Sequence, residues 1–141
     1  MELVTKKRLH LFSGRANRSL ASEIASHLGV ELGDPGITDF ANGEIKCRFQ
    51  ESVRGGDVFI IQSHASAGEM SVNDAIMEQL IMVDAAQRAS AKRITAVVPF
   101  YGYARQDRKA QGREPITARL LADLLYAAGA QRLVSIDLHS G

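Results

Sequence analysis

The sequence contains little that would support a secreted or membrane-bound protein. Its one cysteine, Cys47, excludes an internal disulfide and a cysteine-based zinc cluster, which fits a reducing compartment. Apolar runs long enough to cross a bilayer are lacking, and no long apolar segment follows the basic residues 6–8. We therefore expect a cytoplasmic protein without a secretory signal and without a membrane partner.

A strong excess of charge of one sign is also lacking. The formal net charge is only +1, whereas general nucleic-acid binders usually carry a large basic excess, so nucleic acid is not expected as a partner. The sequence has no internal repeat, low-complexity segment or linker. A hydrophobic content of 45% with 23% charged residues, over 141 residues, is typical of one folded domain with its own core.

Four short apolar runs predict β-strands. They cover residues 9–12, 57–62, 94–98 and 133–136. The unbroken apolar run at 58–61 is typical of a parallel strand that is covered on both faces. Two further segments, 37–40 and 45–49, flank residues 41–44, in which the Asn-Gly pair predicts a β-hairpin.

Stretches with helical spacing separate these strands. Two apolar stripes consist of Leu20, Ile24 and Leu28, and of Ile76, Leu80 and Val83. Asn73 is the predicted N-cap of the second helix, and Met77 and Ile81 widen its stripe. A third helix is predicted at 116–128, directly after Pro115. Strands that alternate with helices predict an α/β fold, in which helices flank a parallel sheet.

Positive charge is concentrated just after the strand at 94–98, at the sheet edge where α/β proteins bind ligands. The cations are Arg105, Arg108, Lys109 and Arg113. Arginine forks suit phosphate oxygens and Gln106 adds neutral donors, so this loop can hold a polyphosphate. The alternative is a solvated loop in which Asp107 and Glu114 balance the cations, but the position at a strand end favours a ligand site.

The pair Asp137 and His139 follows the last predicted strand. Residues two positions apart in extended chain point the same way, so both side chains can point to one side of the sheet. Such a pair can bind a divalent ion, since Mg²⁺ needs few protein ligands when phosphate oxygens complete its shell. A strand-end carboxylate beside a packed histidine explains the same residues, and from the pair alone we favour this simpler interpretation.

The hairpin tip combines an aromatic face, a carboxamide and a carboxylate. These groups belong to Phe40, Asn42 and Glu44. A purine can stack on the aromatic ring and be read by the two polar side chains. Turn chemistry alone nevertheless favours a plain Asn-Gly turn.

Other polar positions give weaker indications. Residues 13–15 follow a strand and precede a helix, but they lack the spacing of a Walker loop or of a GxGxxG motif. We expect an ordinary turn there. His27 is expected on a helix surface, and His10 and His64 have no partners at a suggestive spacing.

Six stretches together resemble the ribose-phosphate pyrophosphokinase family, also called phosphoribosyl pyrophosphate synthetases. They are LFSGRAN, DFANGEI, ESVRGGDVFIIQS, MEQLIMVDAAQRASAKRITAVVPFYGYARQDRK, REPITARLLADLL and DLHSG. They occur in the family's order from about Leu9, and YGYARQDRK is highly specific. The resemblance implies two phosphoribosyltransferase-like α/β domains, of which residues 1–141 form the N-terminal one. It also implies that a short β-hairpin, the flag, is inserted near residues 37–49.

The resemblance further implies transfer of the β,γ-diphosphoryl group of Mg-ATP to the 1-hydroxyl of ribose 5-phosphate, giving phosphoribosyl pyrophosphate and AMP. The residues that match ATP contacts of the family are Phe40, Asn42, Gly43, Glu44, Arg105 and Gln106. Asp137 and His139 match its Mg²⁺ site. The residues that match its regulatory phosphate or ADP site are Ser52, Arg54, Arg108 and Lys109.

Parts of the family pattern are lacking. No catalytic residue of the family falls in this chain, because the catalytic lysine and arginine, the ribose 5-phosphate loop and the rest of the Mg²⁺ region belong to the second domain. Residues 64–72 form a longer loop than the family pattern, and Gly141 stands where some relatives have serine. We therefore expect the isolated chain to be inactive.

The resemblance implies a homo-oligomer, commonly a hexamer, in which the hairpin and the arginine loop of one ATP site come from different subunits. A non-catalytic homologue that assembles with full-length subunits and regulates them is the alternative. Arg105, Gln106 and His139 favour the enzyme, because a purely regulatory chain has no need of them.

Overall fold

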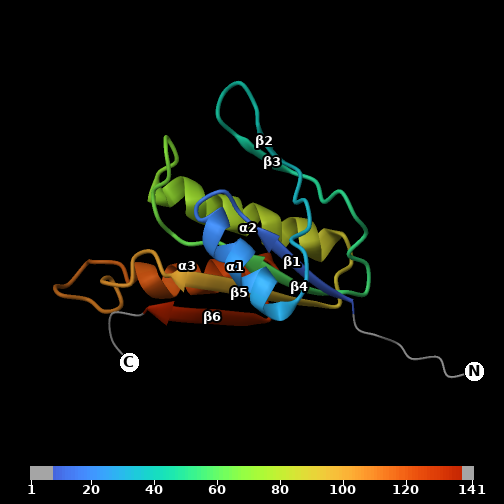
Figure 1. The fold of residues 1–141 in the computed structure, drawn as a ribbon. Helices are drawn as coiled ribbons and strands as arrows, with labels where there is room; N and C mark the ends of the chain where they lie inside the picture. Colours follow the sequence, from blue (N-terminus) through green and yellow to red (C-terminus); the bar gives the residue numbers. More distant parts are fainter. Residues whose placement is uncertain (1–7, 138–141) are drawn as a thin grey trace, which may run out of the picture.

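A four-stranded parallel sheet forms the centre of the protein (Figure 1). The computed structural model describes residues 8–137. The strands lie in the order β1 (Leu9–Ser13), β4 (Asp57–Ile61), β5 (Arg93–Phe100) and β6 (Arg132–Asp137), and all neighbouring pairs are parallel. The predicted α/β fold and its four strands are confirmed, with strand ends that differ from the prediction by one or two residues.

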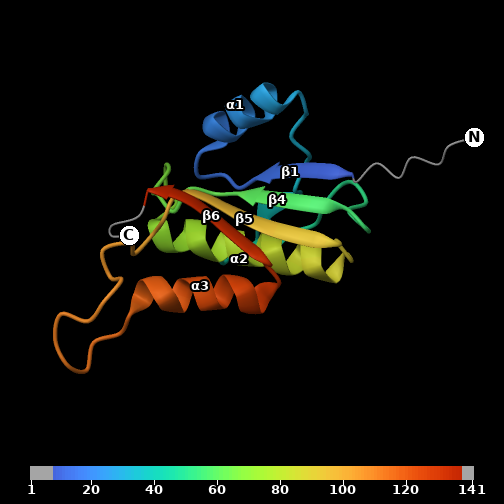
Figure 2. The same cartoon turned by 90° about the horizontal axis from the view of Figure 1, so that it is seen from below.

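Helices cover both faces of the sheet. Helix α1 (Arg18–Leu28) lies on one face, and helices α2 (Val72–Arg88) and α3 (Thr117–Ala128) lie on the other (Figure 2). Successive strand residues point to opposite faces, so Phe12 and Ile60 enter the core under α2 and α3, whereas Leu11 and Ile61 pack against α1. Within residues 8–137, no helix combines the length and the apolar character needed to cross a membrane.

The predicted hairpin is present as a separate two-stranded sheet. Strands β2 (Ile37–Asp39) and β3 (Ile45–Cys47) are antiparallel and stand beyond α2, away from the central sheet (Figure 1). Ile37, Cys47 and Phe49 pack against the larger core at its base. Burial raises the pKa of the Cys47 thiol to about 11, so the thiol stays protonated at neutral pH and donates to the carbonyl of Pro35 at 3.2 Å.

Helix α1 packs through small residues rather than through the whole predicted stripe. Ala21 and Ala25 are buried and Ile24 packs beside them, whereas Leu28 is 57% exposed. The predicted stripe lies on the correct side of the helix. The buried residues are nevertheless the alanines that follow Leu20 and Ile24 in the sequence, because their small side chains let the helix approach the sheet most closely. Asn17 caps the helix, and Gly29 ends it with φ of 69°.

Helix α2 begins with a capping box that the sequence interpretation missed. The Ser71 hydroxyl accepts from the Asp74 amide at 3.1 Å, and the Asp74 carboxylate accepts from the Ser71 amide at 2.9 Å. The predicted N-cap, Asn73, is wrong, because the helix already starts at Val72. The Asn73 side chain instead accepts from the Tyr103 hydroxyl at 2.5 Å.

The buried face of α2 also differs from the predicted stripe. Ile76 and Val83 are buried as expected, but Met77 is 53% exposed. Glu78 and Gln79 are fully buried instead. Burying a polar group without a hydrogen-bond partner costs free energy, and both side chains have such partners.

His64 joins Gln79 to the start of the cationic loop. Its Nε2 lies 2.7 Å from Gln79 Oε1, and its Nδ1 accepts from the Gly102 amide at 2.9 Å. This pattern defines a neutral ring with the proton on Nε2. Burial lowers the pKa of His64 below its usual value of 6.5, and a proton on Nδ1 would oppose the Gly102 amide.

We predict that the free energy of unfolding falls as the pH drops below about 6.5. Above this value His64 is neutral in both states. Below it the unfolded chain binds a proton that the folded chain does not bind until its lowered pKa is reached, so stability is lost on acidification. Urea unfolding between about pH 8 and pH 5 measures this loss.

His27→Gln is the control, because His27 is exposed at the end of α1. It should keep the pH dependence of the wild type, whereas His64→Gln should flatten it. An unchanged slope in His64→Gln contradicts the prediction.

Candidate functional site

The turn after β1 is not an ordinary turn, because it contains Arg15, which forms an ion pair with the buried carboxylate of Glu78. Arg15 Nε lies 2.7 Å from Glu78 Oε1, and the Arg15 amide donates to Glu78 Oε2 at 2.7 Å. Gln62, directly after β4, donates to the same Oε2 at 2.8 Å. Gly14 precedes Arg15, and a Cβ at this position would collide with the Gln62 side-chain amide, so a larger residue there would displace Gln62 from its hydrogen bonds.

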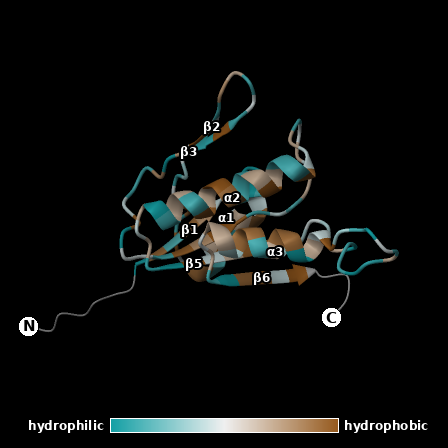
Figure 3. Ribbon diagram, turned by 180° about the vertical axis from the view of Figure 1, so that it is seen from behind, coloured by the Kyte–Doolittle hydropathy of each residue, from teal (hydrophilic) through white to brown (hydrophobic). Residues whose placement is uncertain are grey.

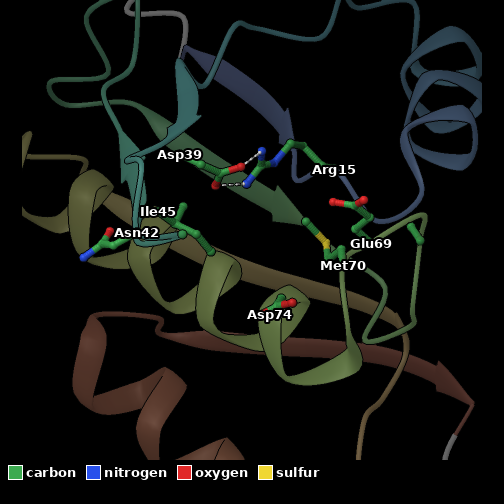
Figure 4. Close-up of a pocket in the computed structure, with 9 residues that line it drawn as sticks. Arg15, Asp39, Asn42, Ile45, Glu69, Met70 and Asp74 are labelled. Atoms are coloured by element: carbon green, nitrogen blue, oxygen red, sulfur yellow. Dashed lines mark hydrogen bonds and ion pairs between the residues drawn. The ribbon is translucent and has the colours of Figure 1, made fainter.

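Arg15 also reaches the hairpin. Its Nη1 and Nη2 donate to the two carboxylate oxygens of Asp39 at 2.9 Å and 2.8 Å (Figure 4). The Arg15 hydrogen bonds hold the pKa of Asp39 below its usual value, and the bond to Asp39 in turn raises the pKa of Arg15. Two carboxylates from distant parts of the chain therefore share one guanidinium.

A cleft of about 570 Å³ opens between the hairpin and the first turn of α2 (Figure 4). Its lining residues are Arg15, Asp39, Asn42, Gly43, Ile45, Ala67, Glu69, Met70 and Asp74. The loop before α2, which is longer than the family pattern, contributes a tight turn to one wall. In this turn the Ala67 amide donates to the Met70 carbonyl at 3.0 Å and the Met70 amide donates to the Ala67 carbonyl at 2.9 Å. The cleft has the size of a small-molecule site.

The hairpin tip presents the predicted aromatic ring to solvent. Phe40 is 53% exposed, and Lys46 Nζ lies 6.0 Å from its ring centroid. The Phe40 and Gly43 amides close the turn, donating to the carbonyls of Glu44 and Phe40 at 2.7 Å and 2.8 Å. Asn42 Oδ1 accepts from the Glu44 amide at 3.1 Å, and the Asn42 side chain donates to the Glu44 carboxylate. The tip is thus an ordered turn with an aromatic side chain that no core requires.

The cationic loop is fixed where it leaves β5 and where it meets α3. The Tyr101 hydroxyl donates to the Ala118 carbonyl at 2.7 Å, and burial raises the pKa of Tyr101 to about 12. Tyr103 adopts φ of 61°, a conformation that a bulky residue keeps only when its surroundings hold it. The side-chain oxygen of Gln106 accepts from Thr117 Oγ1 at 2.8 Å, and the backbone carbonyl of Gln106 accepts from the Ala118 amide at 3.0 Å.

The cations extend outward between these anchors. Arg105, Arg108, Lys109 and Arg113 are all exposed. The predicted helix at 116–128 begins at Thr117, without a side-chain cap. The hairpin and this loop lie on different parts of the molecule (Figures 1 and 3). Among the described residues, none from the loop lines the cleft beside the hairpin.

The four residues matched to a regulatory site fall into two separate pairs. Ser52 and Arg54 are exposed just before β4, at the amino edge of the parallel sheet, and the Arg54 amide donates to Ser52 Oγ at 3.4 Å. Arg108 and Lys109 follow β5, at the carboxyl edge. One chain does not bring the two pairs together.

The pair matched to Mg²⁺ lies at the limit of what the structure describes. Asp137 ends β6 and is paired with Phe100 at the end of β5, whereas His139 lies outside the described residues. Within residues 8–137, no group of three or more His, Cys, Asp or Glu side chains is arranged to hold a metal ion. The Mg²⁺ assignment therefore stays a prediction.

Sequence reasoning missed the Arg15, Glu78 and Gln62 contacts. One pattern in the sequence pointed to them: Glu78 lies three positions after Ala75 and four before Met82, on a face that is otherwise apolar and buried. A carboxylate on such a face needs a cationic partner. The pattern does not say where in the chain that partner lies.

Comparisons with known proteins all point to one family. Residues 9–129 match the family described as the N-terminal domain of ribose phosphate pyrophosphokinase. The chain is 60% identical over 134 residues to a ribose-phosphate pyrophosphokinase of Corynebacterium efficiens, which covers 95% of this chain and 40% of the relative. A ribose-phosphate pyrophosphokinase of Mycobacterium tuberculosis is 57% identical over 135 residues, with coverages of 96% and 40%.

A solved structure extends the likeness to the fold. The crystal structure of phosphoribosylpyrophosphate synthetase from Mycobacterium smegmatis matches with a TM-score of 0.89 and 58% identity, over 95% of this chain and 44% of that one. The parallel sheet with its added hairpin is thus an α/β domain of the type that this synthetase contains. The chain belongs to the ribose-phosphate pyrophosphokinase family, and it spans about 40% of the length of the curated relatives that it matches.

We predict that removing Arg15 costs more stability than removing Glu78. Arg15→Met leaves a fully buried carboxylate without its cation and should cost about 3 kcal/mol of the free energy of unfolding. Glu78→Gln should cost less, because the Arg15 side chain is 35% exposed and still has Asp39. Urea unfolding with both variants measures the order.

The control is Arg88→Met, which breaks an exposed ion pair to Asp84 and should cost less than about 0.5 kcal/mol. Equal losses of unfolding free energy for Arg15→Met and Arg88→Met would show that the Arg15 and Glu78 pair contributes no more stability than an exposed ion pair.

Proposed function

We propose that the full-length protein transfers the diphosphoryl group of Mg-ATP to the 1-hydroxyl of ribose 5-phosphate, giving phosphoribosyl pyrophosphate and AMP, and that this chain provides part of the ATP and Mg²⁺ site. The hydroxyl oxygen attacks the β-phosphorus and loses its proton. The bond from that phosphorus to the oxygen bridging the α-phosphate breaks, and this oxygen leaves with AMP. The observation that carries the proposal is the anchored cationic loop at the carboxyl end of β5, in a chain of this family.

The loop suits the phosphates of the nucleotide. Transfer of a charged phosphoryl group depends on positioning and charge stabilisation more than on covalent help, and exposed cations on a fixed loop provide both. Arg105 is exposed one residue before Gln106, whose side chain and carbonyl are bonded to the start of α3. We assign a forked phosphate contact to Arg105 and a neutral donor to the amide nitrogen of Gln106.

The hairpin tip suits the adenine. An exposed aromatic ring provides a stacking face, and Asn42, Gly43 and Glu44 provide polar groups beside it. The two polar side chains bond to each other, so a base would meet an ordered set of donors and acceptors rather than flexible side chains. The cleft beside the tip provides room for part of a ligand.

Asp137 and His139 are our proposed contribution to the Mg²⁺ site. Asp137 ends a strand next to the one from which the cationic loop leaves, at the same edge of the sheet, and His139 follows it by two positions in the sequence. One carboxylate and one imidazole fit an ion that takes its other ligands from phosphate and water. When bound, Mg²⁺ neutralises phosphate charge and orients the oxygens.

We further propose a cytoplasmic homo-oligomer. Two observations support assembly. The cleft beside the hairpin has no lining residue from the described cationic loop. A groove of about 240 Å³ between α2 and α3 leaves Met77, Leu120 and Leu124 about half exposed. A regulatory phosphate or ADP site that uses both separated pairs would also need a second chain.

We predict that the full-length protein forms AMP from Mg-ATP only when ribose 5-phosphate is present, and that Arg105→Ala weakens this activity strongly. A charge-assisted contact is worth about 1.5–3 kcal/mol, or roughly tenfold to a hundredfold in kcat/KM. Arg105→Lys should also lose activity, because lysine lacks the fork. Steady-state kinetics with both substrates provides the measurement.

Arg119→Ala is the control, since Arg119 is exposed on α3 beside Asp123. Wild-type kinetics in Arg105→Ala would remove Arg105 from the site. A full-length protein that binds Mg-ATP without sugar-dependent AMP formation would favour the regulatory homologue instead.

We predict that Phe40→Ala loses affinity for adenine nucleotides while the fold stays intact. A stacked base is worth about 1–3 kcal/mol, whereas a ring that is already 53% exposed contributes little to stability. Mg-ATP titration and urea unfolding measure the two effects, and Phe40→Tyr should retain both properties. Lost stability with unchanged affinity per folded molecule would make Phe40 a structural residue.

A further inference from the structure

The hairpin depends on the rest of the chain for its position. Strands β2 and β3 pair only with each other in the described sheets, and each has three residues. An isolated two-stranded hairpin is marginally stable in water. Apolar contacts hold its base, through Ile37, Cys47 and Phe49. Near the tip, the side-chain link to the body is the Asp39 carboxylate on Arg15.

The Arg15 guanidinium is itself held in one orientation. Its Nε is bonded to Glu78, whose carboxylate has no exposed surface, and its Nη1 and Nη2 are bonded to the two oxygens of Asp39. A planar group held on one edge presents its other edge at a fixed angle, so the Asp39 carboxylate is oriented as well as attracted. Figure 4 shows this contact at the side of the cleft.

Asp39 is the last residue of β2 and directly precedes Phe40. Its partner across the hairpin is Ile45, so the turn from Phe40 to Glu44 begins and ends at the pair that Arg15 holds. We propose that Arg15 is a positioning residue, which holds the hairpin tip in the orientation that binds the nucleotide. This inference rests on the proposed function of the tip, and the role that it assigns to Arg15 is to position the hairpin rather than to bind the nucleotide.

The proposal has a kinetic consequence that separates it from a general structural role. If the tip is held only part of the time, the apparent KM for ATP rises by the inverse of the held fraction, so a fraction near one-fifth gives about a fivefold rise. Once ATP is bound the tip is in place, so kcat stays the same. General destabilisation would instead reduce the amount of active enzyme and leave KM unchanged.

Asp39→Asn is the test variant, because it leaves the Arg15 and Glu78 pair intact. The amide turns one acceptor oxygen into a donor that faces an Arg15 N–H, so the two-bond contact is lost. Asp84→Asn is the matched control, since Asp84 also forms an arginine ion pair and its side chain is 47% exposed, like that of Asp39. Asp39→Glu keeps the carboxylate and tests for rescue.

The experiment measures steady-state kinetics of the full-length protein together with amide hydrogen exchange over residues 37–47. We expect Asp39→Asn to raise KM for ATP about threefold to tenfold at unchanged kcat, and to speed exchange in the hairpin but not in α2. Asp84→Asn should match the wild type, and Asp39→Glu should recover most of the loss. These results together support the proposal.

Two results would overturn it, each in its own way. Unchanged exchange over residues 37–47 in Asp39→Asn would show that Arg15 does not hold the hairpin, and the proposed function would stand. Faster exchange with unchanged KM would show that the held tip does not bind ATP, so the hairpin part of the proposed function would fail and the positioning role with it.

Discussion

The buried carboxylate of Glu78 is the constraint that holds together the residues on the hairpin side of the candidate site. A carboxylate with no exposed surface is tolerated only where donors surround it, and Glu78 accepts from the Arg15 amide, from Arg15 Nε and from Gln62. These donors come from the turn after β1 and from the residue after β4, so satisfying the carboxylate holds two strand ends against α2. Asp39 then binds the outer edge of the same guanidinium and brings in the hairpin.

Gln79, the next residue on α2, connects the core to the cationic loop in the same way. Gln79 is buried beside Glu78 and is bonded to His64, whose second ring nitrogen accepts from the Gly102 amide at the start of the cationic loop. Two adjacent polar residues of one helix thus lead to two different surfaces, through one intermediate side chain each. Both intermediates follow the carboxyl ends of strands, which is where α/β sheets place ligand sites. The polar part of the core is therefore concentrated where the exposed elements need to be positioned.

The sequence predicted the features that depend on local patterns, and failed where a partner lies far along the chain. Alternating strands and helices, and the Asn-Gly turn, have short-range patterns, so the sheet and the hairpin were predicted correctly. The strand-end position of the cationic loop followed from the same reasoning. Arg15 was interpreted as part of an ordinary turn because Glu78 lies 63 residues away in sequence, and only the fold brings them together. Asn73 failed as an N-cap for a local reason: Ser71 and Asp74 form the more complete capping box two positions earlier.

The hairpin and the cationic loop are separated within one chain, so a site that uses both needs a second copy or a rearrangement. In the proposal, Phe40 stacks on one end of the nucleotide and Arg105 binds the other, yet the hairpin and the loop that carry these residues lie on different parts of one chain (Figures 1 and 3). Rigid anchoring of both elements argues against a rearrangement that would join them, because His64, Tyr101 and Arg15 would all have to lose their bonds. A second copy removes the conflict, since it can place its loop beside the hairpin of the first. The net charge of +1 opposes such an association only weakly. Under the proposed function, assembly is then part of how the site forms, and the rigidity of each chain is what makes the shared site reproducible.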